Sequence, residues 1–214
     1  MRYIYLAIFA IFFTLHLYAS LKNDKHFRNA TKGYLLMSIL GFYLSSDIDH
    51  CWFIIIALLL SFAGDMLLIP HGLKWFTIGG IVFLLSHFFF VLGYSELFSF
   101  SNVPLFAIIL ISIFFVFVVI IIFSKLRKYL PKALFIPMLG YLLVNGAMNS
   151  FAIFRLIACP SLGSTITCIG AFLFFISDTF LFFVRFNKDC KLKSHFFVML
   201  TYSIGELLIV LGLV

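Results

Sequence analysis

Charged side chains are scarce in this chain of 214 residues. Asp, Glu, Lys and Arg together make up 11% of the sequence, whereas about a quarter of a soluble domain is charged. Hydrophobic residues account for 64% and aromatic residues for 20%, with 31 phenylalanines. A soluble domain is therefore excluded. The composition predicts an all-α, polytopic membrane protein with a single transmembrane domain over residues 1–214.

Several motifs of metal and nucleophile chemistry are missing as well. The four cysteines form no CxxC pair, so the spacing of a zinc ribbon or a thioredoxin-like motif is absent. The sequence contains no HExxH, HxxxH or GxSxG, which argues against a zinc hydrolase and a serine hydrolase with a nucleophile elbow. We therefore predict no cofactor and no metal, although carboxylates alone can bind a metal and keep that alternative open.

Apolar runs divide the chain into eight predicted membrane spans, because about 20 apolar residues cross a bilayer. Charged residues or prolines separate most of the runs, and the second run is the shortest. The predicted spans cover residues 2–21, 31–46, 51–69, 75–95, 102–123, 132–154, 162–185 and 194–213.

Basic residues are distributed unevenly between the two ends of these spans. Of the 15 Lys and Arg residues, all but Arg2 and Arg155 lie in or beside the connections after spans one, three, five and seven. The positive-inside rule then predicts both termini on the non-cytoplasmic side. This pattern also accounts for the net charge of +7 without nucleic acid. We expect a multi-pass protein of the bacterial inner membrane, with the endoplasmic reticulum as the second choice.

Two aspartates lie inside apolar runs. Asp65 follows Gly64 in the third span, and Asp178 follows Ser177 in the seventh. A carboxylate at membrane depth costs roughly 2.5–3.5 kcal/mol on insertion scales, so such residues are functional candidates by default. The predicted orientation places both at a similar depth in the cytoplasmic half of the bilayer, where one would act as an acid and the other as a base. Their separation by four spans also suggests a 4+4 helix pseudo-repeat.

Other polar side chains within the spans are predicted to line a cavity with the aspartates. Two groups follow helical i, i+4 spacing and so share a helix face. Each candidate also has a structural interpretation, such as hydrogen bonding between helices or, for Lys32, an ordinary basic residue at the membrane boundary. The candidates are Lys32, His87, the Tyr141/Asn145/Asn149 series, and the Tyr202/Glu206 pair.

An ordered set of these residues resembles the lysoplasmalogenase-like (YhhN-like) family of integral membrane proteins. The chain departs from the family pattern at Gly33, where proline is common, and near Glu206, where glutamine is frequent. The set comprises Thr31-Lys32, Ser61 to Asp65 with Leu68, Gly80, Phe83, His87, Tyr141, Met148, Gly170, Phe174, Ser177-Asp178, Arg185-Phe186 and Thr201-Tyr202.

The resemblance implies a hydrolase that cleaves the vinyl-ether bond of lysoplasmalogens to a fatty aldehyde and a glycerophospho-ethanolamine or -choline. It implies a metal-independent acid/base mechanism with Asp65 and Asp178 as the catalytic pair. The substrate-binding residues would be Lys32, His87, Tyr141, Asn145, Tyr202 and Glu206. The expected partners are the lysophospholipid and the lipid bilayer.

Two other functions remain open from the sequence. A proton-coupled transporter or flippase would also carry carboxylates at membrane depth, with Asp65, Asp178 and Glu206 relaying protons. A purely structural membrane protein would use the same groups as contacts between helices.

Overall fold

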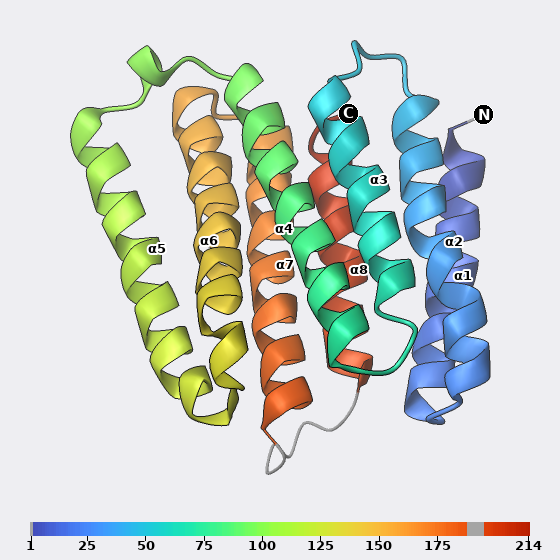
Figure 1. The fold of residues 1–214 in the computed structure, drawn as a ribbon. Helices are drawn as coiled ribbons and strands as arrows, with labels where there is room; N and C mark the ends of the chain where they lie inside the picture. The colour runs from blue at the N-terminus through green and yellow to red at the C-terminus, as the bar shows by residue number, and fades with distance from the viewer. Residues whose placement is uncertain (1, 188–194) are drawn as a thin grey trace.

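The fold is a bundle of eight α-helices in the residues that the structure, a computed structural model, describes, namely 2–187 and 195–214 (Figure 1). The helices are α1 (Tyr3–Leu21), α2 (Lys25–Leu44), α3 (Trp52–Leu67), α4 (Leu73–Glu96), α5 (Leu105–Leu126), α6 (Phe135–Ala158), α7 (Leu162–Phe186) and α8 (His195–Leu211). Three short 3-10 turns lie before α5, after α5 and before α6: η1 (Phe100–Asn102), η2 (Arg127–Tyr129) and η3 (Lys132–Leu134).

The predicted all-α class is confirmed. Five segments within the described residues are long and apolar enough to cross a membrane: Tyr3–Leu21, Leu73–Glu96, Leu105–Tyr129, Lys132–Ala158 and Leu162–Phe186. Helices α3 and α8 are apolar but shorter. The N- and C-termini lie at the same end of the bundle (Figure 1). Which side of the membrane this end faces remains a prediction. Three of the basic residues on which that prediction depends, Lys188, Lys191 and Lys193, lie outside the described residues.

Helix α2 begins at Lys25, six residues before the predicted apolar span starts at residue 31. The side chain of Asp24 accepts a hydrogen bond from the backbone N–H of Phe27 at 3.1 Å, which caps the helix. Hydropathy could not reveal this start because the first turn is polar, with Lys25 and Arg28. As a result Lys32 lies in the third turn of the helix rather than at its opening.

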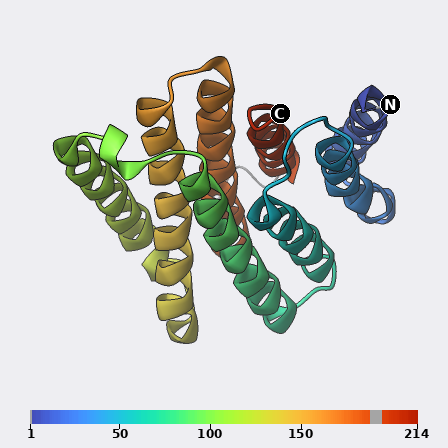
Figure 2. The ribbon, with the colours of Figure 1, turned by 90° about the horizontal axis from the view of Figure 1, so that it is seen from above.

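The helices pack as hairpins around a central group. Helices α1 and α2, α3 and α4, and α7 and α8 form close pairs, while α6 contacts α4, α5 and α7. Viewed from above, α5 forms one edge of the bundle and α1 the other (Figure 2). The middle of the bundle is therefore built from α3, α4, α6, α7 and α8, with α2 beside α3 and α8.

Glycines allow two of these helix pairs to approach closely. A Cβ atom on Gly170 of α7 would lie 2.7 Å from the carbonyl oxygen of Gly205 on α8. A Cβ atom on Gly64 of α3 would lie 2.6 Å from the ring of Phe83 on α4. Small residues at contacts between membrane helices let backbones pack tightly. These contacts fix the helices that carry Asp65 and Asp178.

Candidate active site

Asp65 lies in the interior, bound by residues from two other helices. The Nζ atom of Lys32 on α2 lies 2.9 Å from its Oδ1 atom and 3.1 Å from its backbone carbonyl oxygen. The hydroxyl of Tyr202 on α8 donates to Oδ2 at 2.9 Å. The Asp65 side chain is 4% exposed and that of Lys32 is 13% exposed. The ammonium group beside this carboxylate offsets the cost of burying its charge.

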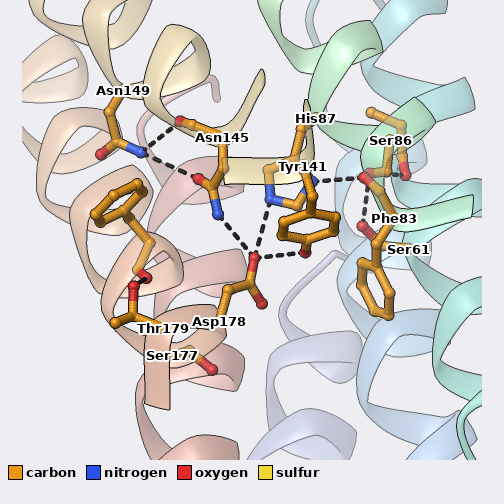
Figure 3. A network of polar contacts seen from close by, with 12 residues as sticks. Ser61, Phe83, Ser86, His87, Tyr141, Asn145, Asn149, Ser177, Asp178 and Thr179 are labelled. Atoms are coloured by element: carbon orange, nitrogen blue, oxygen red, sulfur yellow. Dashed lines mark hydrogen bonds and ion pairs between the residues drawn. The ribbon is translucent and has the colours of Figure 1, made fainter. Parts of the chain in front are cut away.

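Asp178 on α7 is held through one of its two oxygens. The hydroxyl of Tyr141 donates to Oδ2 at 2.6 Å, and the amide of Asn145 donates to the same atom at 2.8 Å. Nε2 of His87 on α4 lies 3.3 Å from it. Figure 3 shows these contacts converging on one oxygen while the other points away. None of the hydrogen bonds among the described residues reaches Oδ1.

His87 on α4 contacts both Phe83 and Asp178. Its Nδ1 atom is hydrogen-bonded to the carbonyl oxygen of Phe83, which only accepts, so Nδ1 carries a proton. Its Nε2 atom faces the carboxyl group of Asp178. A bare imidazole nitrogen and a carboxylate oxygen are both acceptors. At 3.3 Å the two atoms attract each other when one of them carries a proton.

The two aspartates line one cavity of about 150 Å³. It lies at the end of the bundle where α1 joins α2 and α3 joins α4, away from the termini. Lys32 and Tyr202 line the cavity as well. The residues that contact Asp178 on the side away from the cavity are His87, Tyr141 and Asn145, and none of them is among the lining residues. Helices α3 and α7 thus each contribute one aspartate to a common cavity.

The remaining predicted residues lie away from the cavity. Asn149 donates to the backbone carbonyl of Asn145 at 3.0 Å, so it supports the residue that binds Asp178. Glu206 is fully buried, and neither of its carboxyl oxygens has a hydrogen-bond partner among the described residues. Beside it, the hydroxyls of Ser61 and Ser86 are 2.8 Å apart.

Several polar residues that line the cavity were not among the site residues predicted from the sequence, although Ser177 and Arg185 belong to the family-like set. Helical spacing was the signal that could have identified two of them. Arg28 precedes Lys32 by one turn, and Arg185 follows Asp178 by two turns. The unpredicted polar lining residues are His16, Lys25, Arg28, Asn29, Ser177, His71, Arg185 and His195.

The histidines and aspartates that line the cavity are not arranged as a metal site. Across residues 2–187 and 195–214, no group of three or more His, Cys, Asp or Glu side chains is arranged to hold a metal ion. The donors around the aspartates are instead an ammonium group, two phenols, an amide and an imidazole. This set orients carboxyl groups and protons.

An all-α bundle with several membrane-length helices and a buried, carboxylate-lined cavity defines a multi-pass membrane protein with an internal polar site. The chain belongs to the YhhN family, a family of lysoplasmalogenase-like membrane proteins, which it matches over residues 27–213. The resemblance seen in the sequence is thus confirmed. No curated protein and no solved structure matches the sequence significantly.

Proposed function

We propose that this protein hydrolyses the vinyl-ether bond of lysoplasmalogens with Asp65 and Asp178 as its catalytic pair. Membership of the YhhN family supports the substrate class. The observation that carries the mechanism is that two buried aspartates with different partners line the same cavity. One is ion-paired with a lysine, and the other faces a histidine nitrogen at 3.3 Å.

Asp178 acts as the general acid in this proposal. Cleavage of a vinyl ether starts with transfer of a proton to the carbon atom β to the ether oxygen, which leaves an oxocarbenium ion. In this proposal the carboxyl group of Asp178 is protonated on Oδ1, which accepts no hydrogen bond from the described residues, and this proton is transferred to the substrate. Tyr141 and Asn145 fix the carboxyl group so that this oxygen keeps its direction.

Asp65 stabilises the cation and activates water. Its carboxylate is held by Lys32 and Tyr202, and an anion next to an oxocarbenium ion lowers the energy of the transition state. The water that attacks the cation gives one proton to Asp65, which balances the proton that left Asp178. The resulting hemiacetal then releases the glycerol oxygen as an alcohol and leaves a fatty aldehyde.

Aldehyde release from lysoplasmenyl-ethanolamine by the purified protein in detergent tests this proposal. We expect turnover by the natural protein, turnover that survives EDTA, and loss of turnover in Asp65→Asn and Asp178→Asn. Asp47→Asn, in the exposed connection between α2 and α3, is the matched control and should retain full activity. Full activity in either catalytic-site variant would contradict the mechanism. Activity only in sealed vesicles with a gradient would favour a transporter.

A further inference from the structure

The mouth of the cavity carries positive charge from several separate segments. Lys25 and Arg28 lie on α2, Arg185 lies near the end of α7, and His195 begins α8. Lys25, Arg28, Arg185 and His195 all line the same cavity, so their positive groups face a common space. An anion at this position would relieve their mutual repulsion.

These cations have no acidic partner within the described part of the chain. The ion pairs found there are Lys32–Asp65 and His87–Asp178. Asp65 and Asp178 are the acidic side chains that line the cavity, and both already have other partners. The charge at the mouth is therefore available to a ligand.

Arg185 is oriented by its neighbours, so its guanidinium is not a freely moving surface charge. One nitrogen donates to the backbone carbonyl of Gly72 at 3.4 Å, and the group lies 5.4 Å from the centroid of the Phe76 ring. A guanidinium has five N–H donors in a planar fork, and that geometry matches a phosphate. Among the described residues, one of these donors is used in a hydrogen bond, to Gly72.

Lys32 is one of the substrate-binding residues that the family resemblance implies, but its ammonium group is engaged deeper in the bundle. It contacts both the carboxylate and the backbone carbonyl of Asp65. A phosphate drawn to Lys32 would compete with the proposed catalytic carboxylate for the same ammonium. A headgroup phosphate is better accommodated by the unpaired cations nearer the mouth.

The spacing along the helices matches the shape of a lysophospholipid. Arg28 precedes Lys32 by four residues, or about 6 Å along α2, and Arg185 follows Asp178 by seven residues, or about 10 Å along α7. Because arginine side chains are long, their guanidinium groups can lie closer to the aspartates than these distances along the helix axes. In a lysophospholipid, a three-carbon glycerol separates the phosphate from the ether oxygen. A phosphate at the two arginines therefore places the ether bond at the aspartates.

We propose that Arg28 and Arg185 form a phosphate subsite at the cavity mouth, which binds the headgroup phosphate of a lysophospholipid and sets the depth of its ether bond. This rests on the proposed function for the identity of the substrate. Phosphate recognition at the mouth can nevertheless be measured without turnover. The subsite makes the phosphate, rather than the ethanolamine or choline, the part of the headgroup that determines affinity.

The test is binding of two saturated lipids, which lack the vinyl ether, to the full-length protein in detergent. One is a 1-O-alkyl lysophosphoethanolamine, and the other is a 1-O-alkylglycerol with no phosphate. In the double variant Arg28→Gln/Arg185→Gln we expect affinity for the phosphate lipid to fall about tenfold or more, because charged hydrogen bonds are lost. Affinity for the alkylglycerol should not change. Lys125→Gln/Lys128→Gln, at exposed residues outside the cavity lining, is the matched control and should change neither affinity.

Two further experiments identify the source of the phosphate and test the subsite without any variant that could misfold. Inorganic phosphate should compete only weakly with the lipid, since it lacks the chain; competition at equal concentrations would instead indicate a free-phosphate site and overturn the lipid subsite. In the natural protein, rising salt should weaken binding of the phosphate lipid but not of the alkylglycerol. Equal salt dependence of the two lipids would contradict the proposal without any variant.

The outcome also separates this inference from the proposed function. Arginine-dependent binding without aldehyde release would support the subsite and reject vinyl-ether hydrolysis. Aldehyde release with unchanged affinity and KM in Arg28→Gln/Arg185→Gln would reject the subsite and leave the hydrolase in place.

Discussion

Lys32 on α2 and Asp65 on α3 form an ion pair of 2.9 Å inside the bundle. Most of both side chains is shielded from the surroundings. A buried pair of this kind adds little net stability, because the cost of removing two charges from water offsets their attraction. Removing one partner alone is costly, because the other charge is left uncompensated. The pair therefore allows structural and catalytic roles to be separated.

We expect Lys32→Met and Asp65→Asn each to destabilise the protein, by about 3–5 kcal/mol where an uncompensated charge remains. The double variant Lys32→Met/Asp65→Asn should recover much of that stability, because no buried charge is left. It should still lack aldehyde release, because the carboxylate is absent. Thermal unfolding in detergent and the aldehyde assay measure the two effects. Recovery of activity together with stability would show that the pair serves the fold alone.

Tyr202 and Tyr141 each donate one hydrogen bond to a different aspartate, at 2.9 Å and 2.6 Å. Replacing either by phenylalanine keeps the ring packing and removes only the donor. Hydrogen bonds to charged groups contribute about 1.5–3 kcal/mol; Asp65 is charged throughout the proposed step and Asp178 becomes charged as its proton leaves, so kcat should fall on the order of 10- to 100-fold in each variant. Tyr18→Phe, at an exposed position on α1, is the control. Steady-state kinetics test this, and an unchanged kcat in both variants would contradict it.

The helices and the aspartates could be predicted from the sequence, because hydropathy and the cost of a buried carboxylate are local properties. The partners of the aspartates could not be assigned. Lys32 precedes Asp65 by 33 residues, and Tyr202 follows it by 137. Only the packing of α2 and α8 against α3 brings these groups together.

Two features of the cavity were hidden for different reasons. The polar first turn of α2, capped by Asp24, has no hydropathy signal, so Arg28 was taken for an ordinary loop residue. Glu206 shares a helix face with Tyr202, and i, i+4 spacing alone gave both residues the same role. The structure separates them, because Tyr202 reaches the cavity and Glu206 does not.

Close contact between α7 and α8 depends on glycine. Gly170→Ala should destabilise the protein, because the new Cβ atom would lie 2.6 Å from the backbone nitrogen of Ile209 and would push the helices apart. The cost should reach the 1–3 kcal/mol typical of overpacking. Gly80→Ala, on α4, is the matched control, because nothing lies within 4 Å of its Cβ position. Unfolding temperatures compare the two, and equal values would show that the contact tolerates a methyl group.

The carboxyl group of Glu206 is fully buried and has no hydrogen-bond partner among the described residues. A buried polar group without a partner costs roughly 1–3 kcal/mol by protein mutational data. Glu206→Met fills a similar volume without a polar head, so we expect the unfolding temperature to rise.

The same variant tests whether Glu206 binds substrate. Since it does not line the cavity, Glu206→Met should leave the KM for lysoplasmenyl-ethanolamine unchanged, whereas Lys32→Met should impair catalysis. A tenfold rise in KM would return Glu206 to the substrate-binding residues. A higher unfolding temperature with a lower kcat would mean that the cost of burying this carboxyl is retained for the reaction, since active sites commonly trade stability for function.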